Sequence, residues 1–525
     1  MSTVMLDKFS VSIAGEPVLN DISVLVNQGQ RLGVVGRTGA GKSILARAIV
    51  GLLPHGATPT GSLRFDDTPL PDDGAALAKL RGKRIGLLLQ DAAEAMDPLA
   101  TAGAHIAEAL TAAGETADLE AQTGQWLADV GLDRSLAGRY PQDLTPGERS
   151  RVMLAVALAG KPDLLIADEP LAHLDVLAQR QVIGLIEKLC DARQMSLLLI
   201  AHDLKLVALL CTRVIVLEAG RVVEAGDKAE VFGRPKHAHT RLLMTAGRHR
   251  ARTLMRTPIG AVLLEVRDVK RVYKRRDLPI FSPRSSIVAL DGVSLSIRQG
   301  ESMALIGPSG SGKTTLARII AGLERATSGE LEIDHAVYHG TDLPRIQRRE
   351  ISLVFPDPSQ SFNPALTVGE SIAEPLQLES QRLIDELSER MVEAVTGVGL
   401  TTDVLGFRPD AFSLPELQRL AIARALITRP RLIILDEPLR ALDVVGRGEL
   451  LVMLNRLRAD FGLTFLVISQ DLAMVRVVAD RVLVMDKGRI VESGAPAMLF
   501  DSPQHELTRQ LAAAALPEVG IVPVF

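Results

Sequence analysis

Two glycine-rich segments carry residue types and spacings that suit the binding of a phosphate chain. Both match the pattern G-x-x-x-x-G-K-[ST], as GRTGAGKS at residues 36–43 and as GPSGSGKT at residues 307–314. Glycines let the backbone turn until its N–H groups and the start of a helix face an anion. In such a loop the lysine reaches the β- and γ-phosphates, and the last hydroxyl serves Mg²⁺. The spacing therefore predicts two sites for a nucleoside triphosphate with Mg²⁺.

Each segment lies in the sequence context that such a loop requires. An apolar run, RLGVV or SMALI, precedes it and a helix-forming stretch follows it, so a strand–turn–helix unit is predicted twice. The predicted phosphate-binding residues of the first segment are Gly36, Arg37, Thr38, Gly39, Ala40, Gly41, Lys42 and Ser43. Those of the second segment are Gly307, Pro308, Ser309, Gly310, Ser311, Gly312, Lys313, Thr314 and Thr315.

The two loops belong to an internal repeat. The acidic segments LLIADEP and IILDEP place Asp168 and Asp436 268 residues apart, and the loops themselves lie 271 residues apart. A self-similarity of this length predicts a duplicated domain with small insertions. We therefore expect a first domain over residues 1–247, a linker over residues 248–260 and a second domain over residues 261–525.

The elements that must position the loops can be read from the apolar pattern. In both halves, apolar runs of four to six residues alternate with longer helical patterns, such as residues 42–53, 104–113 and 149–159. This alternation is typical of βαβ units with buried parallel strands. Residues 248–260 are basic and contain a proline near their end, so a solvated linker is favoured there over a nucleic-acid contact.

The composition is that of a globular protein. Of the 525 residues, 47% are apolar and 23% are charged, which allows large cores. A net charge of −4 and a pI near 6.3 give no electrostatic reason for a nucleic-acid partner. Cys190 and Cys211 are expected to be small buried side chains rather than a disulfide. No secretory signal or membrane-spanning run is found, so we expect a soluble protein that reaches a membrane only through partners.

Further motifs follow each loop in the same order. The first half reads LLLQD, LTPGE, LLIADEP, LAHLD and IAHDL, and the second reads VFPDP, FSLPE, IILDEP, LRALD and ISQDL. Together they resemble the ATP-binding cassette (ABC) family rather than P-loop kinases or GTPases, over almost the whole chain. The resemblance implies an α/β fold of two P-loop NTPase domains in tandem, each with a RecA-like parallel sheet, an antiparallel β subdomain and a helical subdomain. It also implies ATP and Mg²⁺ as cofactors and ATP hydrolysis as the activity.

The resemblance assigns particular residues to ATP hydrolysis. Those expected to serve Mg²⁺ are Ser43, Gln90, Asp168, Thr314 and Asp436. Those expected to be catalytic are Glu169, His202, Glu437 and Gln470. A carboxylate beside the γ-phosphate suits this work because the attacking water must be oriented and partly deprotonated. Two positions depart from the family: Gln470 replaces its switch histidine, and Pro356 replaces the glutamine that Gln90 supplies in the first half.

The family signature LSGGQ would contact the γ-phosphate of the nucleotide held by the opposite half of a head-to-tail dimer. Here LTPGE would contribute Thr145 and Gly147, and FSLPE would contribute Ser413. Each ATP site would therefore combine residues of one half with the signature of the other. The first-half loop would meet the poorer signature, FSLPE, and the second-half loop the better one, LTPGE.

Both signatures depart from the family pattern. Pro146 and Pro415 remove N–H donors, and Leu414 adds bulk where a glycine lets phosphate approach. Glu148 and Glu416 bring negative charge towards a polyanion, at a spacing that also fits a helix capping box. We expect both signatures to bind γ-phosphate weakly. Because the first half keeps both His202 and Gln90, the site around its loop is expected to drive hydrolysis.

Two other features refine the resemblance. Tyr273 stands where the family stacks an aromatic ring on adenine, and Ile13 stands at the equivalent place in the first half. The segments PKHAHTRLL and PQHELTRQL share the pattern P-x-H-x-x-T-x-x-L, which is similar to the tails of ATPases from dipeptide, oligopeptide and nickel importers. Taken alone, each tail predicts a turn and an amphipathic helix, with His237 and His505 as caps or surface residues. The first tail lacks the cysteine-rich extension of many such ATPases, so no iron–sulfur cluster is expected.

Together the motifs predict the tandem ATPase subunit of a bacterial-type importer. It would act at the cytoplasmic face of the inner membrane, with two membrane-spanning permease subunits fed by a solute-binding protein. Residues 99–110 and 365–376 would line the grooves for the permeases, and the cargo would be a short peptide, a nickel chelate or a related solute. Three alternatives stay open: a tandem sugar-importer ATPase, a soluble ABC protein acting on ribosomes or DNA, and a non-hydrolysing regulatory module.

Overall fold

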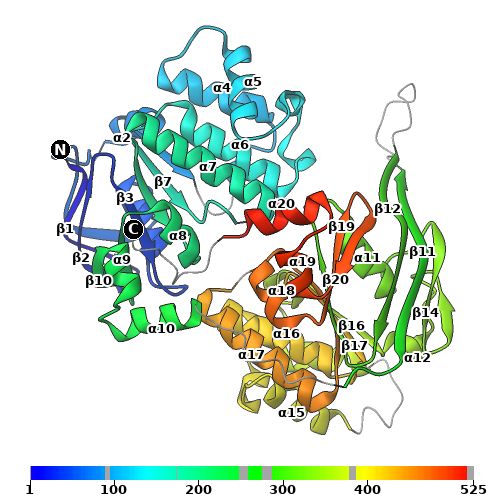
Figure 1. The fold of residues 1–525 in the computed structure, drawn as a ribbon. Helices are drawn as coiled ribbons and strands as arrows, with labels where there is room; N and C mark the ends of the chain where they lie inside the picture. The colour runs from blue at the N-terminus through cyan, green and yellow to red at the C-terminus, as the bar shows by residue number, and fades with distance from the viewer. Residues whose placement is uncertain are drawn as a thin grey trace. The chain divides into compact units, whose positions relative to one another are not determined.

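The computed structural model describes most of the chain. The described residues are 2–71, 73–88, 95–172, 174–247, 258–274, 286–377, 386–440 and 442–516. The chain divides into two compact units, drawn mainly from residues 1–249 and from residues 250–515 (Figure 1). Most of the expected linker lies outside the described ranges, so the domain limits at 247 and 261 stay predictions.

Two sheets form the framework of the first unit. A four-stranded sheet has the order β2-β1-β4-β5, and a six-stranded sheet has the order β10-β9-β3-β8-β7-β6. In the larger sheet, the pairs from β9 through β3, β8 and β7 to β6 are parallel, and β10 is antiparallel to β9. The strands are β1 (Ser2–Ile13), β2 (Glu16–Asn27), β3 (Arg31–Val35), β4 (Ala57–Phe65), β5 (Thr68–Pro69), β6 (Ile85–Leu88), β7 (Leu164–Asp168), β8 (Ser196–Ile200), β9 (Arg213–Glu218) and β10 (Arg221–Asp227).

The helices of the first unit cover the larger sheet and also form a separate helical region around α4 and α5. They are α1 (Lys42–Ile49), α2 (Gly74–Lys83), α4 (Ala102–Ala113), α5 (Leu119–Asp129), α6 (Pro146–Ala159), α7 (Val176–Arg193), α8 (Leu204–Leu210), α9 (Lys228–Gly233), α10 (Ala238–Gly247), and the 3₁₀ turns η1 (Arg134–Gly138) and η2 (Pro141–Asp143). The helix expected over residues 42–53 ends earlier, because the chain turns through the left-handed Gly51 at φ 65°.

The second unit repeats this framework. Its sheets have the orders β12-β11-β14-β15 and β16-β17-β18-β13-β19-β20, again with an antiparallel strand at the edge of the larger sheet. The strands are β11 (Val262–Lys274), β12 (Ser286–Arg298), β13 (Ser302–Ile306), β14 (Ser328–Ile333), β15 (Ala336–Tyr338), β16 (Ile351–Val354), β17 (Leu432–Asp436), β18 (Thr464–Ile468), β19 (Arg481–Asp486) and β20 (Arg489–Gly494).

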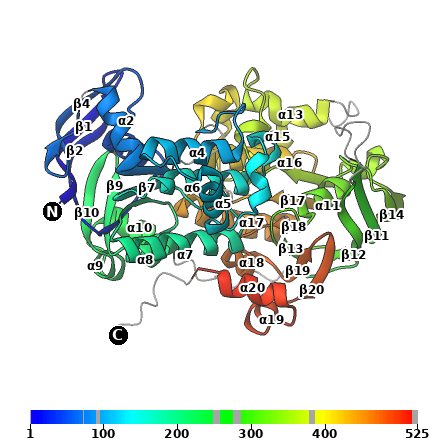
Figure 2. The same cartoon turned by 90° about the horizontal axis from the view of Figure 1, so that it is seen from above.

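The helices of the second unit follow the same chain order as those of the first (Figure 2). They are α11 (Lys313–Ile320), α12 (Arg345–Arg348), α13 (Val368–Gln377), α15 (Leu387–Gly397), α16 (Leu414–Leu426), α17 (Val444–Phe461), α18 (Leu472–Val478), α19 (Pro496–Asp501), α20 (Glu506–Ala514), and the 3₁₀ turns η3 (Ser359–Ser361), η4 (Thr402–Gly406) and η5 (Pro409–Ala411).

Alternation along the central strands places the larger sheets between two apolar layers. In β17, Leu432 and Ile434 join the core that contains α11 and the smaller sheet. Ile433 and Leu435 join the core that contains α13, α15 and α16. Successive side chains of a strand point to opposite faces, so a strand buried on both sides is apolar throughout. The parallel α/β fold with an antiparallel β subdomain and a helical subdomain is therefore confirmed in both units.

The expectations about the cysteines and about membrane-spanning segments can be compared with the structure. Cys190 and Cys211 are buried free thiols, as predicted, and burial raises their pKa values to about 11 and about 12. Among the described residues, no helix combines the length and apolar character that crossing a membrane requires.

Candidate active sites

The first phosphate loop joins β3 to α1. A Cβ at Gly36 would lie 2.3 Å from the carbonyl oxygen of Leu217, so only glycine fits there. Gly41 begins α1 at φ 95° and has no side chain to cap it, which leaves N–H groups of the first turn for an anion. Nζ of Lys42 donates to the carbonyl oxygens of Gly36 and Arg37, both at 2.9 Å. The loop is thus a cradle with an ammonium group folded against it.

The second phosphate loop joins β13 to α11 in the same way. A Cβ at Gly307 would lie 2.1 Å from the carbonyl oxygen of Met485, and Gly312 begins α11 at φ 104° without a side-chain cap. Nζ of Lys313 donates to the carbonyl oxygens of Gly307 and Pro308, both at 2.8 Å. The predicted strand–turn–helix context is confirmed for both loops.

The tips of the two loops share one turn geometry. The N–H groups of Ala40 and Ser311 each donate at 3.2 Å to the carbonyl oxygen three residues earlier, so both loops turn alike. A Cβ at Gly39 or at Gly310 would meet nothing within 4 Å. The tips leave room there for a ligand. The same segments hold the remaining predicted residues, Arg37, Thr38, Pro308 and Ser309.

Each loop meets an aspartate at the end of a central strand. The hydroxyl of Ser43 donates to Asp168, and that of Thr314 donates to Oδ2 of Asp436 at 3.1 Å. Burial raises the pKa of both aspartates, and the two hydroxyls oppose this rise. Oδ1 of each aspartate is buried, with no hydrogen-bond partner among the described residues. A hydroxyl beside an unpartnered carboxylate oxygen fits a hard cation such as Mg²⁺, whose other ligands would be phosphate and water.

The position that would supply a glutamine to this cation cannot be compared between the halves. Gln90 lies outside the described residues. Its counterpart Pro356 follows β16, is half-buried and has no side-chain donor or acceptor. The second half therefore lacks a polar side chain at this point.

The glutamate after each aspartate has the same backbone geometry. Glu169 and Glu437 adopt left-handed φ values of 50° and 48°. Their N–H groups each donate at 2.9 Å to the last residue of the neighbouring strand, Ile200 or Ile468. A left-handed conformation is strained for a residue other than glycine, and such strain gathers at functional sites. Both halves thus hold the glutamate in one shared and unusual orientation.

In the first half, both carboxylate oxygens of Glu169 have partners. The N–H of His202 donates to Oε1 at 2.8 Å, and Nδ1 of His202 lies 2.7 Å from Oε2. Burial raises the pKa of Glu169, but His202 and Lys42 outweigh it and hold that pKa below the ordinary value. The structure therefore brings together Glu169 and His202, which are 33 residues apart in the sequence. A carboxylate held ionised in this way can orient a water molecule and accept its proton.

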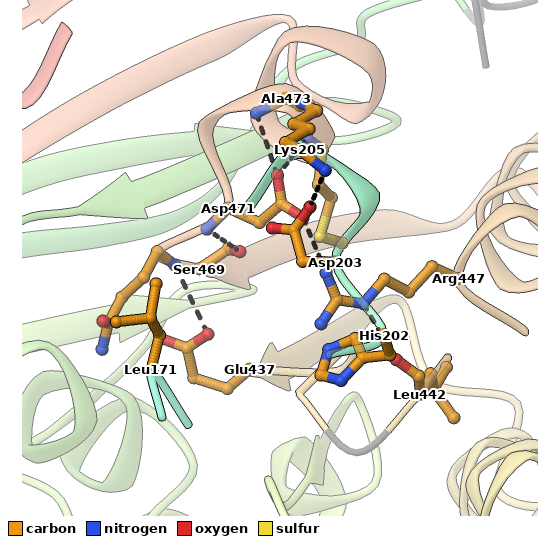
Figure 3. Close-up of polar contacts among 12 residues, drawn as sticks. Leu171, His202, Asp203, Lys205, Glu437, Leu442, Arg447, Ser469, Asp471 and Ala473 are labelled. Carbon is orange, nitrogen blue, oxygen red and sulfur yellow. Dashed lines mark hydrogen bonds and ion pairs between the residues drawn. The ribbon is translucent and has the colours of Figure 1, made fainter. Parts of the chain in front are cut away.

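In the second half, Glu437 lacks an imidazole partner. The N–H of Gln470 donates to its Oε2 at 3.3 Å, and its buried Oε1 has no hydrogen-bond partner in the described part of the chain. Figure 3 shows the carboxylate turned towards the segment that carries Ser469 and Asp471. Burial raises the pKa of Glu437 to about 7, and Asp436 adds to this rise while Lys313 opposes it. The two glutamates have the same backbone but different electrostatic surroundings.

Ser469, in the motif ISQDL, also has a structural role that the motif pattern does not predict. Its hydroxyl accepts the N–H of Asp471 at 3.0 Å, and Asp471 in turn caps α18 through the N–H groups of Ala473 and Met474. Ala201 stands at the corresponding place in IAHDL, so this bond exists only in ISQDL. The aligned motifs contained this difference, but a serine for an alanine carries no chemical signal by itself.

Because the pKa of Glu437 is raised and that of Glu169 is lowered, we expect the two carboxylates to affect stability in opposite ways as pH changes, in the absence of nucleotide and Mg²⁺. A raised pKa in the folded state means that stability from protonated Glu437 is present below the unfolded pKa and is lost as pH rises through about 7. Glu437→Gln keeps the neutral form and should raise the Tm at pH 8, with up to about 3 kcal/mol of stabilisation, but not at pH 4.5. Calorimetry in EDTA would measure this.

Glu169→Gln is the matched control. The pKa of Glu169 is depressed, so its contribution is present above the unfolded value and lost as pH falls. This variant should lower the Tm at pH 8, because it removes the pairing with His202. Equal shifts of the same sign in the two variants would contradict the difference between the halves.

Both altered signatures form the capping boxes that their spacing predicts. The N–H of Thr145 donates to Glu148 at 2.7 Å, and the N–H of Glu148 donates to the Thr145 hydroxyl at 3.3 Å. In the second half, the N–H and the hydroxyl of Ser413 both donate to Oε2 of Glu416, at 2.9 and 2.6 Å. Gly147 lies in the first turn of α6, beside this box. Each glutamate therefore occupies hydrogen-bonding groups that the resemblance assigns to phosphate.

The place predicted for adenine differs between the halves. Tyr273 lies on β11 with its hydroxyl 3.5 Å from that of Thr315, on the helix that follows the second loop. The Arg271 guanidinium already covers this ring, 4.6 Å from its centroid. In each smaller sheet one residue has a left-handed backbone, Lys8 on β1 and Asp268 on β11. Ile13 and Tyr273 each follow that residue by five positions, so Ile13 is the structural counterpart of Tyr273.

The two tails share a backbone contact that the sequence did not reveal. In each half a glutamate on the edge strand accepts two consecutive N–H groups of the tail. Glu224 accepts those of Lys236 and His237, at 2.9 and 3.0 Å. Glu492 accepts those of Gln504 and His505, also at 2.9 and 3.0 Å. The imidazole of His505 caps α20, so the interpretation of this histidine as a cap is confirmed.

Comparison with known proteins agrees with this geometry. The family described as ABC transporter matches residues 19–172 and 290–440. The peptidoglycan transport ATP-binding protein YejF of Agrobacterium fabrum is 36% identical over 512 residues, which cover 95% of this chain and 92% of that protein. The glutathione import ATP-binding protein GsiA of Escherichia coli K12 is 32% identical, over 94% of this chain and 86% of its own length.

A second relative from Escherichia coli K12, the uncharacterized ABC transporter ATP-binding protein YejF, is 35% identical over 94% of this chain and 95% of its own length. The two family matches each contain a phosphate loop and an acidic strand, and the relatives span both halves. This chain therefore belongs to the ABC transporter family, as an ATPase with two tandem ATP-binding cassettes.

Proposed function

We propose that this chain is the ATP-hydrolysing subunit of an importer for short peptides or related small solutes, nickel chelates included. The names of its relatives, peptidoglycan transport and glutathione import, support a peptide-like cargo. The paired P-x-H-x-x-T-x-x-L tails support the same branch of the family. These observations favour a peptide-type importer over a tandem sugar-importer ATPase, a soluble ABC protein acting on ribosomes or DNA, or a non-hydrolysing regulatory module.

The arrangement that we propose for the working protein follows the family. Residues 1–247 and 261–525 would be the two cassettes, joined by a linker over residues 248–260. They would bind two ATP with Mg²⁺ in head-to-tail sites and drive two permease subunits fed by a solute-binding protein. The chain would lie at the cytoplasmic face of the inner membrane, held there by the permeases.

Within this arrangement, we assign hydrolysis chiefly to the first-half carboxylate. The observation that carries this assignment is the pair of contacts from His202 to both oxygens of Glu169, against the unpartnered Oε1 of Glu437. When bound, Mg²⁺ would neutralise phosphate charge, held by Ser43 and Asp168. Glu169 would orient the water and take its proton, while His202 keeps the carboxylate in position. The second loop would mainly hold nucleotide.

A transport assay tests the proposed function. Deletion of the gene in its source bacterium should abolish accumulation of labelled tripeptide, glutathione or Ni²⁺, whichever is the cargo. Wild type should restore it, and Lys42→Ala should not, because the lysine is needed at the phosphates. Unchanged uptake of all three solutes, together with co-sedimentation of the protein with ribosomes, would contradict the proposal.

A further inference from the structure

A pocket of about 260 Å³ lies in the second unit, at the edge of the larger sheet where two central strands begin. Arg431 directly precedes β17, and Leu463 directly precedes β18. The other ends of these strands carry the candidate ATP-site residues, because β17 ends at Asp436 and Gln470 follows shortly after the end of β18. Five extended residues, about 16 Å, therefore separate the pocket from the candidate ATP site. The pocket is therefore a separate site from the one described above.

The lining combines positive charge with an apolar floor. Three arginines, Arg390, Arg429 and Arg431, line the pocket together with one carboxylate, Glu393. Glu393 pairs with Arg429, and a carboxylate outside the lining, Glu386, pairs with Arg390 at 2.8 Å. The floor includes the buried side chains of Ala394, Leu426 and Leu463, and the ring of Phe461, which is 42% exposed. A surface of this kind suits a ligand that has an anionic group at one end and an apolar group at the other.

The arginines keep donors for such a ligand. Arg429 uses Nε and Nη2 on Glu393, at 3.1 and 2.6 Å. Within the described ranges, the ion pairs of Arg431 are long, 3.4 Å to Asp334 and 3.5 Å to Glu350. A guanidinium group has five N–H donors and can bind a carboxylate or a phosphate with two of them at once. Arg429 and Arg431 can therefore offer their remaining N–H groups to an anion while they keep their present carboxylate partners.

A smaller hollow of about 190 Å³ adjoins the pocket and shares Arg390 and Arg429 with it. Thr428 lines this hollow, and its buried hydroxyl has no hydrogen-bond partner among the residues that the structure describes. Arg349 and the carboxylate of Glu350 line the same hollow. Native proteins rarely leave a buried hydroxyl unpaired, so its place beside three guanidinium groups and one carboxylate is consistent with a polar ligand.

The corresponding place in the first unit has the opposite charge. There Asp163 and Leu164 donate their N–H groups to the carbonyl oxygen of Arg84, and in the second unit Arg431 and Leu432 donate to that of Glu350. The backbone is the same, yet the ion pair is reversed: Arg84 with Asp163 in one unit, Glu350 with Arg431 in the other. The second unit thus presents a guanidinium group where the first presents a carboxylate.

The residue that follows the long helix also differs between the two units. The helices α7 and α17 both have 18 residues and end at Arg193 and Phe461. The next residue is Gln194 at φ 52° in the first unit and Gly462 at φ 63° in the second. A Cβ at Gly462 would meet nothing within 4 Å. Exchange of a long polar side chain for glycine opens space beside an aromatic ring.

We propose that this pocket binds a small organic anion, a carboxylate or phosphate joined to an apolar group. The anion would lie against Arg429 and Arg431 and the apolar group against Phe461. The volume is below the roughly 300–1,000 Å³ of pockets for drug-sized ligands, so ATP and peptides are too large for it. The proposal does not depend on the transported solute, because the pocket lies about 16 Å from the nucleotide-binding residues of the same strands.

Calorimetry on the full chain tests the proposal, with Mg·ADP in excess so that the phosphate loops are occupied. The probes are benzoate, phenyl phosphate and, as a cation of the same shape, benzylamine. We expect benzoate or phenyl phosphate to bind at one site and benzylamine not to bind. Gly462→Gln, which copies the first unit in a conformation that glutamine already adopts there, should weaken binding at least tenfold.

A charge-swapped variant separates the anion contact from folding. Glu350→Arg with Arg431→Asp copies the ion pair of the first unit, so the pair is kept while the guanidinium at the pocket is lost. It should also weaken binding at least tenfold with an unchanged Tm. Lys161→Ala, at the first-unit position that matches Arg429, is the control and should bind as wild type. Absence of binding to wild type, equal binding of benzylamine, or unchanged binding in both test variants would overturn the proposal.

Discussion

Glu169→Gln is expected to lower the ATP turnover of the purified chain at least about 100-fold. The physical reason is that Glu169 is the glutamate held by contacts to both oxygens, 2.8 Å from the N–H and 2.7 Å from Nδ1 of His202. Glutamine keeps the shape but cannot take a proton, and general-base catalysis contributes roughly 10²–10⁴-fold. Steady-state phosphate release at pH 7.5 would measure the loss.

Glu437→Gln is the paired control for this prediction. Its carboxylate has one contact, at 3.3 Å from the N–H of Gln470, and an unpartnered buried oxygen. We expect turnover to fall less than about threefold, because this glutamate lacks the imidazole that keeps its counterpart oriented. An equal loss in the two variants, or a larger loss in Glu437→Gln, would show that the second half carries at least as much of the hydrolysis.

Asp168→Asn is expected to raise the Mg²⁺ concentration for half-maximal turnover about 10–100-fold, the effect of losing one interaction with a charged ligand. Oδ1 of Asp168 is buried without a partner, beside a hydroxyl of Ser43 that donates to the same carboxylate. An amide keeps an acceptor oxygen but loses the negative charge that a hard cation prefers. Turnover measured across a Mg²⁺ titration, with chelator as the zero point, would show the shift.

Asp436→Asn changes the mirror position and tests whether the effect belongs to one half. Asp436 has the same unpartnered Oδ1 and accepts the hydroxyl of Thr314 at 3.1 Å. This variant should reduce the number of nucleotides bound in the presence of Mg²⁺ from two to one, with a smaller effect on turnover than Asp168→Asn. An unchanged Mg²⁺ requirement in both variants would remove these aspartates from the cation site.

Much of the fold and the candidate sites could be predicted because the signals are local. A glycine such as Gly36 or Gly307 is needed where a carbonyl oxygen lies within 2.3 Å of where a Cβ would stand, so the loop pattern follows directly from backbone geometry. Period-two and helical patterns identify strands and helices, and a threonine or serine three residues before a glutamate identifies a helix start. These features need only neighbours along the chain.

The sequence alone therefore determined the duplication, the two phosphate loops, the acidic strand ends and the altered signatures. Only the tertiary structure decided how equivalent residues differ. Glu169 and Glu437 are the same residue in the same motif, yet one pKa lies below its ordinary value and the other near 7, since burial and a partner 33 residues away set the balance. The pocket beside Arg431 likewise depends on side chains from separate elements. Charge, burial and open space are sums over neighbours in three dimensions, which no local pattern contains.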